Sequence, residues 1–157
     1  MSRPVLNHTE LKGFQAWKAE WESGQPFTLK DYLYANGNLD LAAAFIEYFW
    51  PEVIEHEGCY FLSLQYSNES FLSWKKHLKN NKTRIELVMN HVHIYDMFGS
   101  SEKQDQEYNL VVDEYIALTM QQSWEAALKI QFPNVNFRVT FETEPNAYGP
   151  TISFHAL

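Results

Sequence analysis

Several side chains that could do chemistry lie close together in one segment, from Arg84 to Phe98. His91 and His93 could bind a metal ion or exchange a proton near neutral pH. Asp96 could serve as a general base, or could orient one. The secondary structure of the segment decides which role is available, because it sets the directions in which these side chains point.

Two histidines separated by one residue share a face of a strand, but they lie roughly 200° apart on a helix. On a strand, His91 and His93 could hold a metal ion through their two imidazoles, whereas on a helix they could not bind one ion together. The stretch Ile85–Asp96 does not alternate cleanly between apolar and polar residues, so we favour a helix. We therefore predict no metal site and no cofactor, with the strand as the alternative.

On such a helix, Asp96 would lie in the middle of an apolar face. That face comprises Ile85, Val88, Met89, Val92 and Tyr95, and the polar strip opposite comprises Glu86, Asn90 and His93. A buried carboxylate costs several kcal/mol unless it is paired, and negative charge in the last turn opposes the helix dipole. We predict that Asp96 is paired across the core and that Asp96→Ala destabilises more than His93→Ala. The alternatives are a catalytic Asp96, or an exposed Asp96 beyond a helix that ends early.

A catalytic site could also be assembled from several elements. If the protein is an enzyme, the candidate residues are His91, His93, Asp96 and Glu114. Glu114 lies early in a long helix expected over 107–132, where acidic residues already suit the helix dipole without any catalytic role. The sequence has no G-x-G-x-x-G, Walker, G-x-S-x-G or H-E-x-x-H motif, so we lean away from an enzyme.

A loop expected between the last two strands offers two candidate binding residues, Asn146 and Tyr148. The stretch Glu144–Pro150 is rich in turn-forming residues and presents an aromatic ring at its tip, and such loops often carry recognition. The alternative is a rigid hairpin connection in which Tyr148 folds back on the core.

The elements that must position these residues are those of an α+β protein. Helical spacing and capping residues predict helices over 9–24, 28–37, 38–51, 68–81, 84–98 and 107–132. Alternating or β-branched sequence predicts strands over 59–66, 135–143 and 151–157. We interpret 52–56 as a further strand, with a continuation of the preceding helix as the rival. The expected fold is a single globular domain over 1–157, with helices packed on a small antiparallel sheet of three to four strands.

Composition limits the partners of the chain. Its 157 residues carry a formal net charge of −8, so neither nucleic acid nor a membrane is an expected partner. The N-terminus shows no signal-peptide pattern, and no apolar run approaches the length of a membrane span. The single cysteine, Cys59, excludes an internal disulfide and fits a reducing compartment, so we expect the cytoplasm. Cys59 heads an apolar strand and is expected to be a buried, inert thiol.

The function expected from these features is binding rather than catalysis. An acidic, aromatic-rich module without a catalytic signature suits a non-enzymatic protein that binds another protein, and its oligomeric state stays open. One alternative is a small metal-dependent or acid–base enzyme that uses the 84–98 segment. A weaker alternative is a small-molecule-binding domain with an aromatic-lined pocket.

Overall fold

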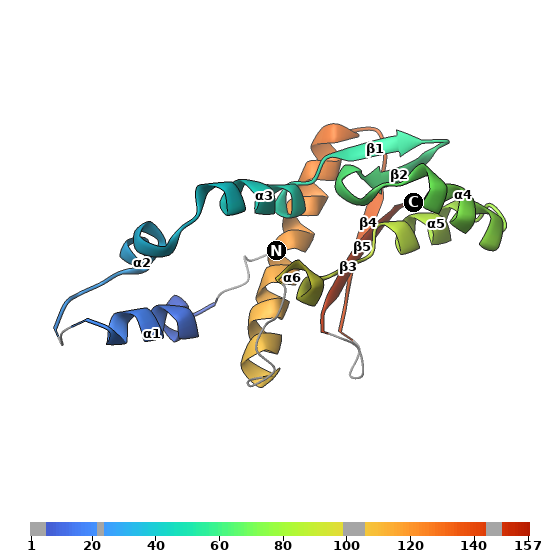
Figure 1. Cartoon of the computed structure of the whole chain (residues 1–157). Coiled ribbons are helices and arrows are strands. Elements are labelled where there is room, and N and C mark those ends of the chain that lie inside the picture. Colours follow the sequence, from blue (N-terminus) through green and yellow to red (C-terminus); the bar gives the residue numbers. More distant parts are fainter. Residues whose placement is uncertain (1–5, 22–23, 99–105, 144–148) are drawn as a thin grey trace. The chain divides into compact units, whose positions relative to one another are not determined.

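The computed structural model describes residues 6–21, 24–98, 106–143 and 149–157, and its elements form two compact units. One unit spans Val5–Phe45 and the other contains Ile46–Leu157 (Figure 1). The α+β class expected from the sequence is confirmed. The single domain over 1–157 stays a prediction, because a division by contacts does not measure whether the two units fold independently.

The N-terminal unit is built from short helices. Its elements are η1 (His8–Glu10), α1 (Lys12–Ala19), α2 (Leu29–Asn36) and the first part of α3 (Leu39–Phe49). The Thr28 side chain and the Asp31 carboxylate form a capping box at the start of α2, and Asn38 accepts a 2.8 Å hydrogen bond from the Leu41 amide at the start of α3. Between α1 and α2 lies a cluster of rings: Phe14, Trp17, Trp21, Phe27 and Tyr32.

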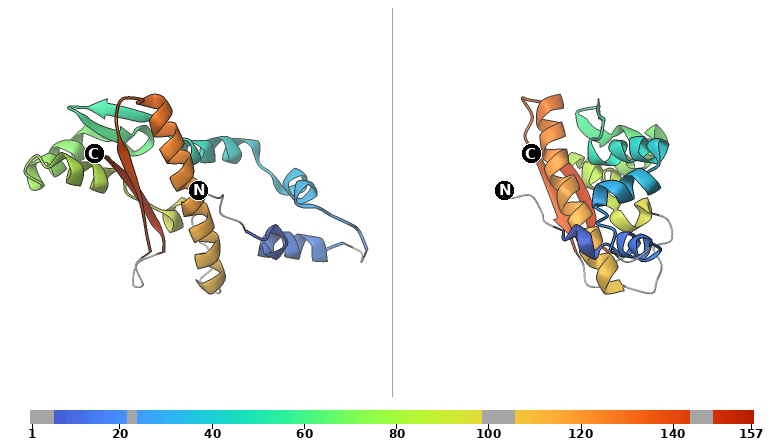
Figure 2. Two further views of the ribbon diagram at one scale, coloured as in Figure 1. Left: turned by 180° about the vertical axis from the view of Figure 1, so that it is seen from behind. Right: turned by 90° about the vertical axis from the view of Figure 1, so that its left-hand side faces the viewer.

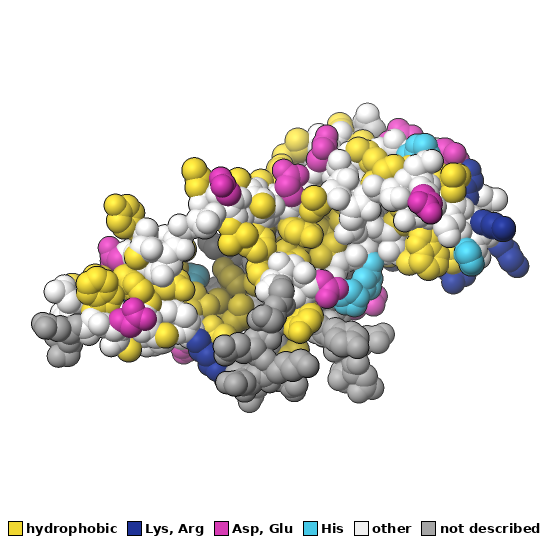
Figure 3. Space-filling view, in the orientation of Figure 1, with side chains coloured by type: hydrophobic (Ala, Val, Ile, Leu, Met, Phe, Trp, Pro, Cys, Tyr) yellow, Lys and Arg dark blue, Asp and Glu magenta, His cyan; other side chains and the backbone are white. Residues whose placement is uncertain are grey.

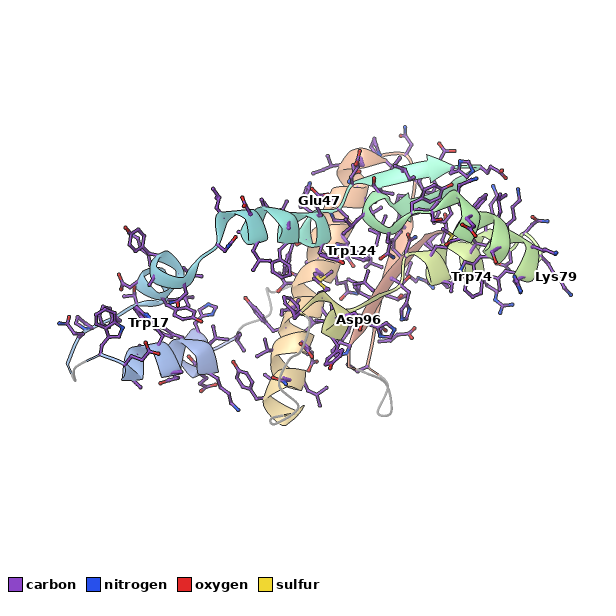
Figure 4. All side chains as sticks on the ribbon, viewed as in Figure 1. Trp17, Glu47, Trp74, Lys79, Asp96 and Trp124 are labelled. Carbon is purple, nitrogen blue, oxygen red and sulfur yellow. The ribbon has the colours of Figure 1, made fainter. Side chains whose placement is uncertain are left out.

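The core of the C-terminal unit forms around its longest helix, α6 (Gln106–Gln131). Its buried side chains are Ala117, Met120, Trp124, Ala127 and Leu128. Trp124 projects from α6 (Figure 4). Its indole meets the ring of Phe154 edge-on at 5.9 Å and donates a 2.7 Å hydrogen bond to the Tyr48 carbonyl. No helix in the described part of the chain is both long and apolar enough to cross a membrane.

A three-stranded antiparallel sheet packs one face on α6 (Figure 2). Its order is β3-β5-β4, with β3 at Val92–His93, β4 at Phe137–Glu142 and β5 at Thr151–Ala156. The two-residue alternation turns the apolar side chains toward α6, and the core includes Val139, Ile152 and Phe154. The opposite face, called the outer face below, carries three cross-strand pairs: Arg138–His155, Thr140–Ser153 and Glu142–Thr151.

A separate two-stranded hairpin pairs β1 (Val53–His56) with β2 (Cys59–Leu62). Its turn residues, Glu57 and Gly58, have φ of 52° and 71°, as the two central residues of a type I′ turn require. The strand interpretation of 52–56 is therefore confirmed. The expectation that 59–66 joins the larger sheet is wrong, because β2 pairs only with β1 among the described strands.

Side chains of one short helix take the place of the missing pairing between β2 and β5. The helix is α5 (Lys82–Met89), which follows α4 (Asn68–His77). Glu86 accepts hydrogen bonds from the amides of Tyr60 on β2, at 2.8 Å, and Ala156 on β5, at 2.9 Å. One buried carboxylate thus satisfies a backbone donor on each of the two sheets.

Asn90, one turn after Glu86, makes the complementary contacts. Its Oδ1 accepts from the Leu62 amide at 3.0 Å, and its Nδ2 donates to the carbonyls of Tyr60 at 2.8 Å and Phe154 at 3.2 Å. The side chains of Glu86 and Asn90 are both fully buried. Glu86 and Asn90 therefore tie the hairpin to the sheet.

The prediction of a helix over 84–98 is wrong beyond Met89. The Asn90 amide makes the last helical hydrogen bond, to Glu86, and the chain then extends to pair Val92 with Ile152. A short 3-10 helix, η3 (Ile94–Met97), follows. Pairing with β5 and the side-chain hydrogen bonds of Asn90 stabilise the extended chain more than a continued helix would. Glu86 and Asn90 are buried and do not form an exposed polar strip.

Candidate functional site

The two histidines meet beside β3. His93 is the last residue of β3, and His91 immediately precedes the strand, so both project to the same side as the period of two requires. Their Nε2 atoms are 3.1 Å apart, and their ring centroids are 4.5 Å apart with an interplanar angle of 68°. The strand arrangement that the sequence left as the alternative is the one present.

A polar hollow of about 220 Å³ lies next to this pair on the outer face of the sheet. His93 pairs with Thr151 on β5, and Thr151 pairs with Glu142 on β4, so the three residues form one row across the sheet. The hollow is lined by Leu87, His91, Thr140, Glu142, Thr151 and Ser153. Because β5 joins the row in the middle, the sheet brings His91 and Glu142 to one site from positions far apart in the sequence.

Three effects act on the pKa of His91. Burial lowers the pKa of His91, and the neighbouring His93 lowers this pKa further, whereas the Glu142 carboxylate acts to raise it. The Nδ1 atom of His93 is buried and has no hydrogen-bond partner among the described residues. His91 keeps enough exposed surface for the pair to be reached from solvent.

The structure does not bring the other predicted catalytic residues to this site. Asp96 lies on η3 and is exposed (Figure 4), so its predicted pairing in the core is wrong; the helix ends before it. Glu114 is exposed on α6. In the described ranges, no group of three or more His, Cys, Asp or Glu side chains is arranged to hold a metal ion.

Two residues predicted to bind, Asn146 and Tyr148, fall outside the described residues, so their role stays a prediction. One residue of the outer face was missed: His155, which is buried beside Arg138. Burial lowers the pKa of His155, and the charge of Arg138 lowers this pKa further. The alternation of 151–157 would have placed His155 on the face opposite the core, but it does not predict that the side chain is buried there.

Cys59 offers no reactive thiol. The side chain is buried, as expected from its place at the head of a strand. Burial raises the pKa of the thiol, and the nearby Glu86 carboxylate raises it further. The neutral thiol is therefore favoured at physiological pH, and Cys59 belongs to the packing of β2 against α4 and α5.

The N-terminal unit presents a second candidate site, a surface rather than a hollow. Among its described residues Phe14 is the only buried side chain. Hydrophobic side chains lie on the surface of this unit instead (Figure 3). The exposed fraction is 93% for Tyr34 and 86% for Leu39. The exposed set within this unit is Trp21, Leu33, Tyr34, Leu39 and Leu41, and we call it the apolar surface.

The composition of α3 makes this exposure unusual. Its sequence, LDLAAAFIEYF, has only two charged residues, yet no side chain of this fully described helix is buried. A helix that is apolar over most of its circumference is normally covered by protein or lipid. The same composition is visible in the sequence as the uninterrupted apolar run from Leu41 to Ile46.

The chain matches no protein-family model, and comparisons with curated proteins and with solved structures gave no match.

Proposed function

We propose that this protein is a non-enzymatic binding module that docks another protein through the apolar surface of its N-terminal unit. One observation carries the proposal: this unit has a single buried side chain among its described residues while it exposes large apolar ones. A segment of this size rarely supplies enough burial to hold a fold alone. Contact with a partner would supply the missing burial, at roughly 25 cal/mol for each Å² of apolar surface covered.

Charge favours a basic partner over a second copy of the chain. The formal net charge of −8 attracts a positively charged protein and speeds its encounter, whereas two copies repel each other. Asp40 lies beside Leu39 at the start of α3 and is exposed. We therefore expect a partner that offers an apolar patch bordered by Lys or Arg.

The polar hollow does not favour a small-molecule function. At about 220 Å³ it is smaller than the roughly 300–1,000 Å³ of typical ligand sites. Hydroxyl groups of Thr140, Thr151 and Ser153 line it, and they already donate to backbone carbonyls. The aromatic side chains that would hold an organic ligand are not among its lining residues.

Site-specific photo-crosslinking tests the docking surface. A photoreactive amino acid at position 34 should give a discrete adduct with a different protein in a native lysate, because Tyr34 is the most exposed ring of the apolar surface. The matched control places the same group at Ile130, an exposed apolar residue of α6 at 69% accessibility.

Loss of the adduct in a Leu39→Asp background would tie it to the surface. An aspartate in the first turn of α3 suits the helix dipole, so this change removes apolar area without breaking the helix. The proposal is contradicted by an absence of adducts, by adducts with a second copy only, or by the same adduct from position 130.

A further inference from the structure

We propose that His91 and His93 form a binding site for a divalent transition-metal ion, with Glu142 as the nearby carboxylate. The proposal is independent of the docking surface. The two Nε2 atoms lie 3.1 Å apart, and the rings lean toward each other, since the centroids are only 4.5 Å apart. Rings that met end to end through these nitrogens would place their centroids farther apart.

The spacing suits a shared ligand. A metal ion at about 2.05 Å from each nitrogen, a typical metal–imidazole length, would subtend an N–metal–N angle of roughly 100° at a nitrogen separation of 3.1 Å. That angle lies between the 90° of square-planar or octahedral sites and the about 109° of tetrahedral sites. The histidines therefore need little movement to hold one ion.

Glu142 could add a third donor only if its side chain moved, because the described side chains form no ready group of three ligands. Glu142, Thr151 and His93 form one row across β4, β5 and β3, so the backbones of Glu142 and His93 are two strand spacings, roughly 9.6 Å, apart. The Glu142 carboxylate already acts electrostatically on His91 and is exposed, so it is free to rotate toward an ion. The remaining coordination positions would be filled by water from the hollow.

The donor set selects the class of ion. Two neutral imidazoles and one carboxylate suit Cu²⁺, Ni²⁺ and Zn²⁺, whereas Mg²⁺ and Ca²⁺ prefer oxygen ligands alone. Affinity should be highest for Cu²⁺, as the general order of divalent stabilities requires. The metal-free pair is joined by a single N–H···N hydrogen bond, which the ion would replace.

Titration of the full-length, untagged protein with CuCl₂, NiCl₂, ZnCl₂ and MgCl₂ in a calorimeter tests the site. We expect one Cu²⁺ per chain, with affinity at least tenfold weaker in His91→Gln and in His93→Gln. Glu142→Gln should weaken binding less. The control is His77→Gln, because His77 is an exposed histidine on α4 bonded to its own helix, through the Ser73 carbonyl.

Electron paramagnetic resonance of the Cu²⁺ form provides a readout that a change in folding would not imitate. The wild-type spectrum should show two coordinating imidazole nitrogens, and each single histidine variant should show one. Equal Cu²⁺ affinity in wild type and both histidine variants would overturn the proposal. So would an unchanged nitrogen count in His91→Gln and His93→Gln, or a loss of binding in His77→Gln alone.

Discussion

Glu86 and Asn90 hold the C-terminal unit together at the scale of single residues. Between them they satisfy five backbone groups on two strands that do not pair with each other. Polar side chains at these positions look like an exposed strip when a single helix is viewed alone. Their role depends on strands that lie far away in the sequence, so their burial could not be predicted from the pattern of one helix.

The charge of Glu86 should make stability depend on pH. Burial is the largest effect on its pKa and raises it above the ordinary 4.5, although hydrogen bonds from Ala156 and Tyr60 act to lower it. A carboxyl with a raised pKa contributes stability that is present below its unfolded pKa and lost as pH rises through the folded pKa. The free energy of unfolding of wild type, relative to Glu86→Gln, should therefore fall from pH 4 to pH 7.

Urea denaturation of both proteins across this range measures that difference, and glutamine is a matched control because it stays neutral throughout. A wild-type advantage that grows toward pH 7 would mean that the two backbone donors outweigh burial, and that the pKa of Glu86 is lowered instead.

His91 and His93 show what the sequence could and could not decide. Their spacing required that a strand bring them together and a helix separate them, and the structure has the strand. Asp96 was expected in the core because the helix was extended too far. Once η3 begins at Ile94, the helical phase that placed Asp96 among apolar residues no longer applies.

At the scale of elements, α5 acts as a cross-link between the hairpin and the sheet. The helix begins at a capping asparagine, Asn81, and ends where the Asn90 side chain turns inward. Hairpin, long helix and C-terminal strands were predictable, because their patterns depend on neighbouring residues. The two-residue strand β3 was not, because only its pairing with β5 defines it.

Removal of one half of this cross-link should be costly. Asn90→Ala leaves a buried amide of Leu62 and two carbonyls without their partners. Each such loss costs about 1–3 kcal/mol, so we expect the free energy of unfolding to drop by at least about 2 kcal/mol. Chemical denaturation measures the drop, and Asn134→Ala, at an exposed asparagine, is the control.

A change of less than about 0.5 kcal/mol in Asn90→Ala, similar to that of an ordinary surface substitution, would show that β2 and β5 do not need this bridge.

At the scale of the whole molecule, the two units differ in how much they bury. The C-terminal unit has a core around Trp124, whereas Phe14 is the only buried side chain among the described residues of the N-terminal unit. The aromatic content of the sequence does not distinguish rings that fill a core from rings that face solvent. That distinction depends on tertiary contacts, which 16% aromatic content does not specify.

Hydrogen exchange should reveal this difference in the isolated protein. Amides of α2 and of residues 39–45 should exchange far faster than those around Trp124 in α6. Local opening of the N-terminal unit exposes little additional apolar surface, so it costs little free energy. Mass spectrometry of a dilute, monomeric sample measures both regions in one experiment. Equal protection of the two regions would mean that the N-terminal unit is stable without a partner.

The most direct test of the docking surface is the mass of the complex that the protein forms in its native lysate. Native mass spectrometry of the affinity-isolated protein should show wild type and Ile130→Asp bound to a different, basic protein, and Leu39→Asp as the free chain of 18.5 kDa. A free wild-type chain, a homodimer, or a complex that survives Leu39→Asp unchanged would contradict the account.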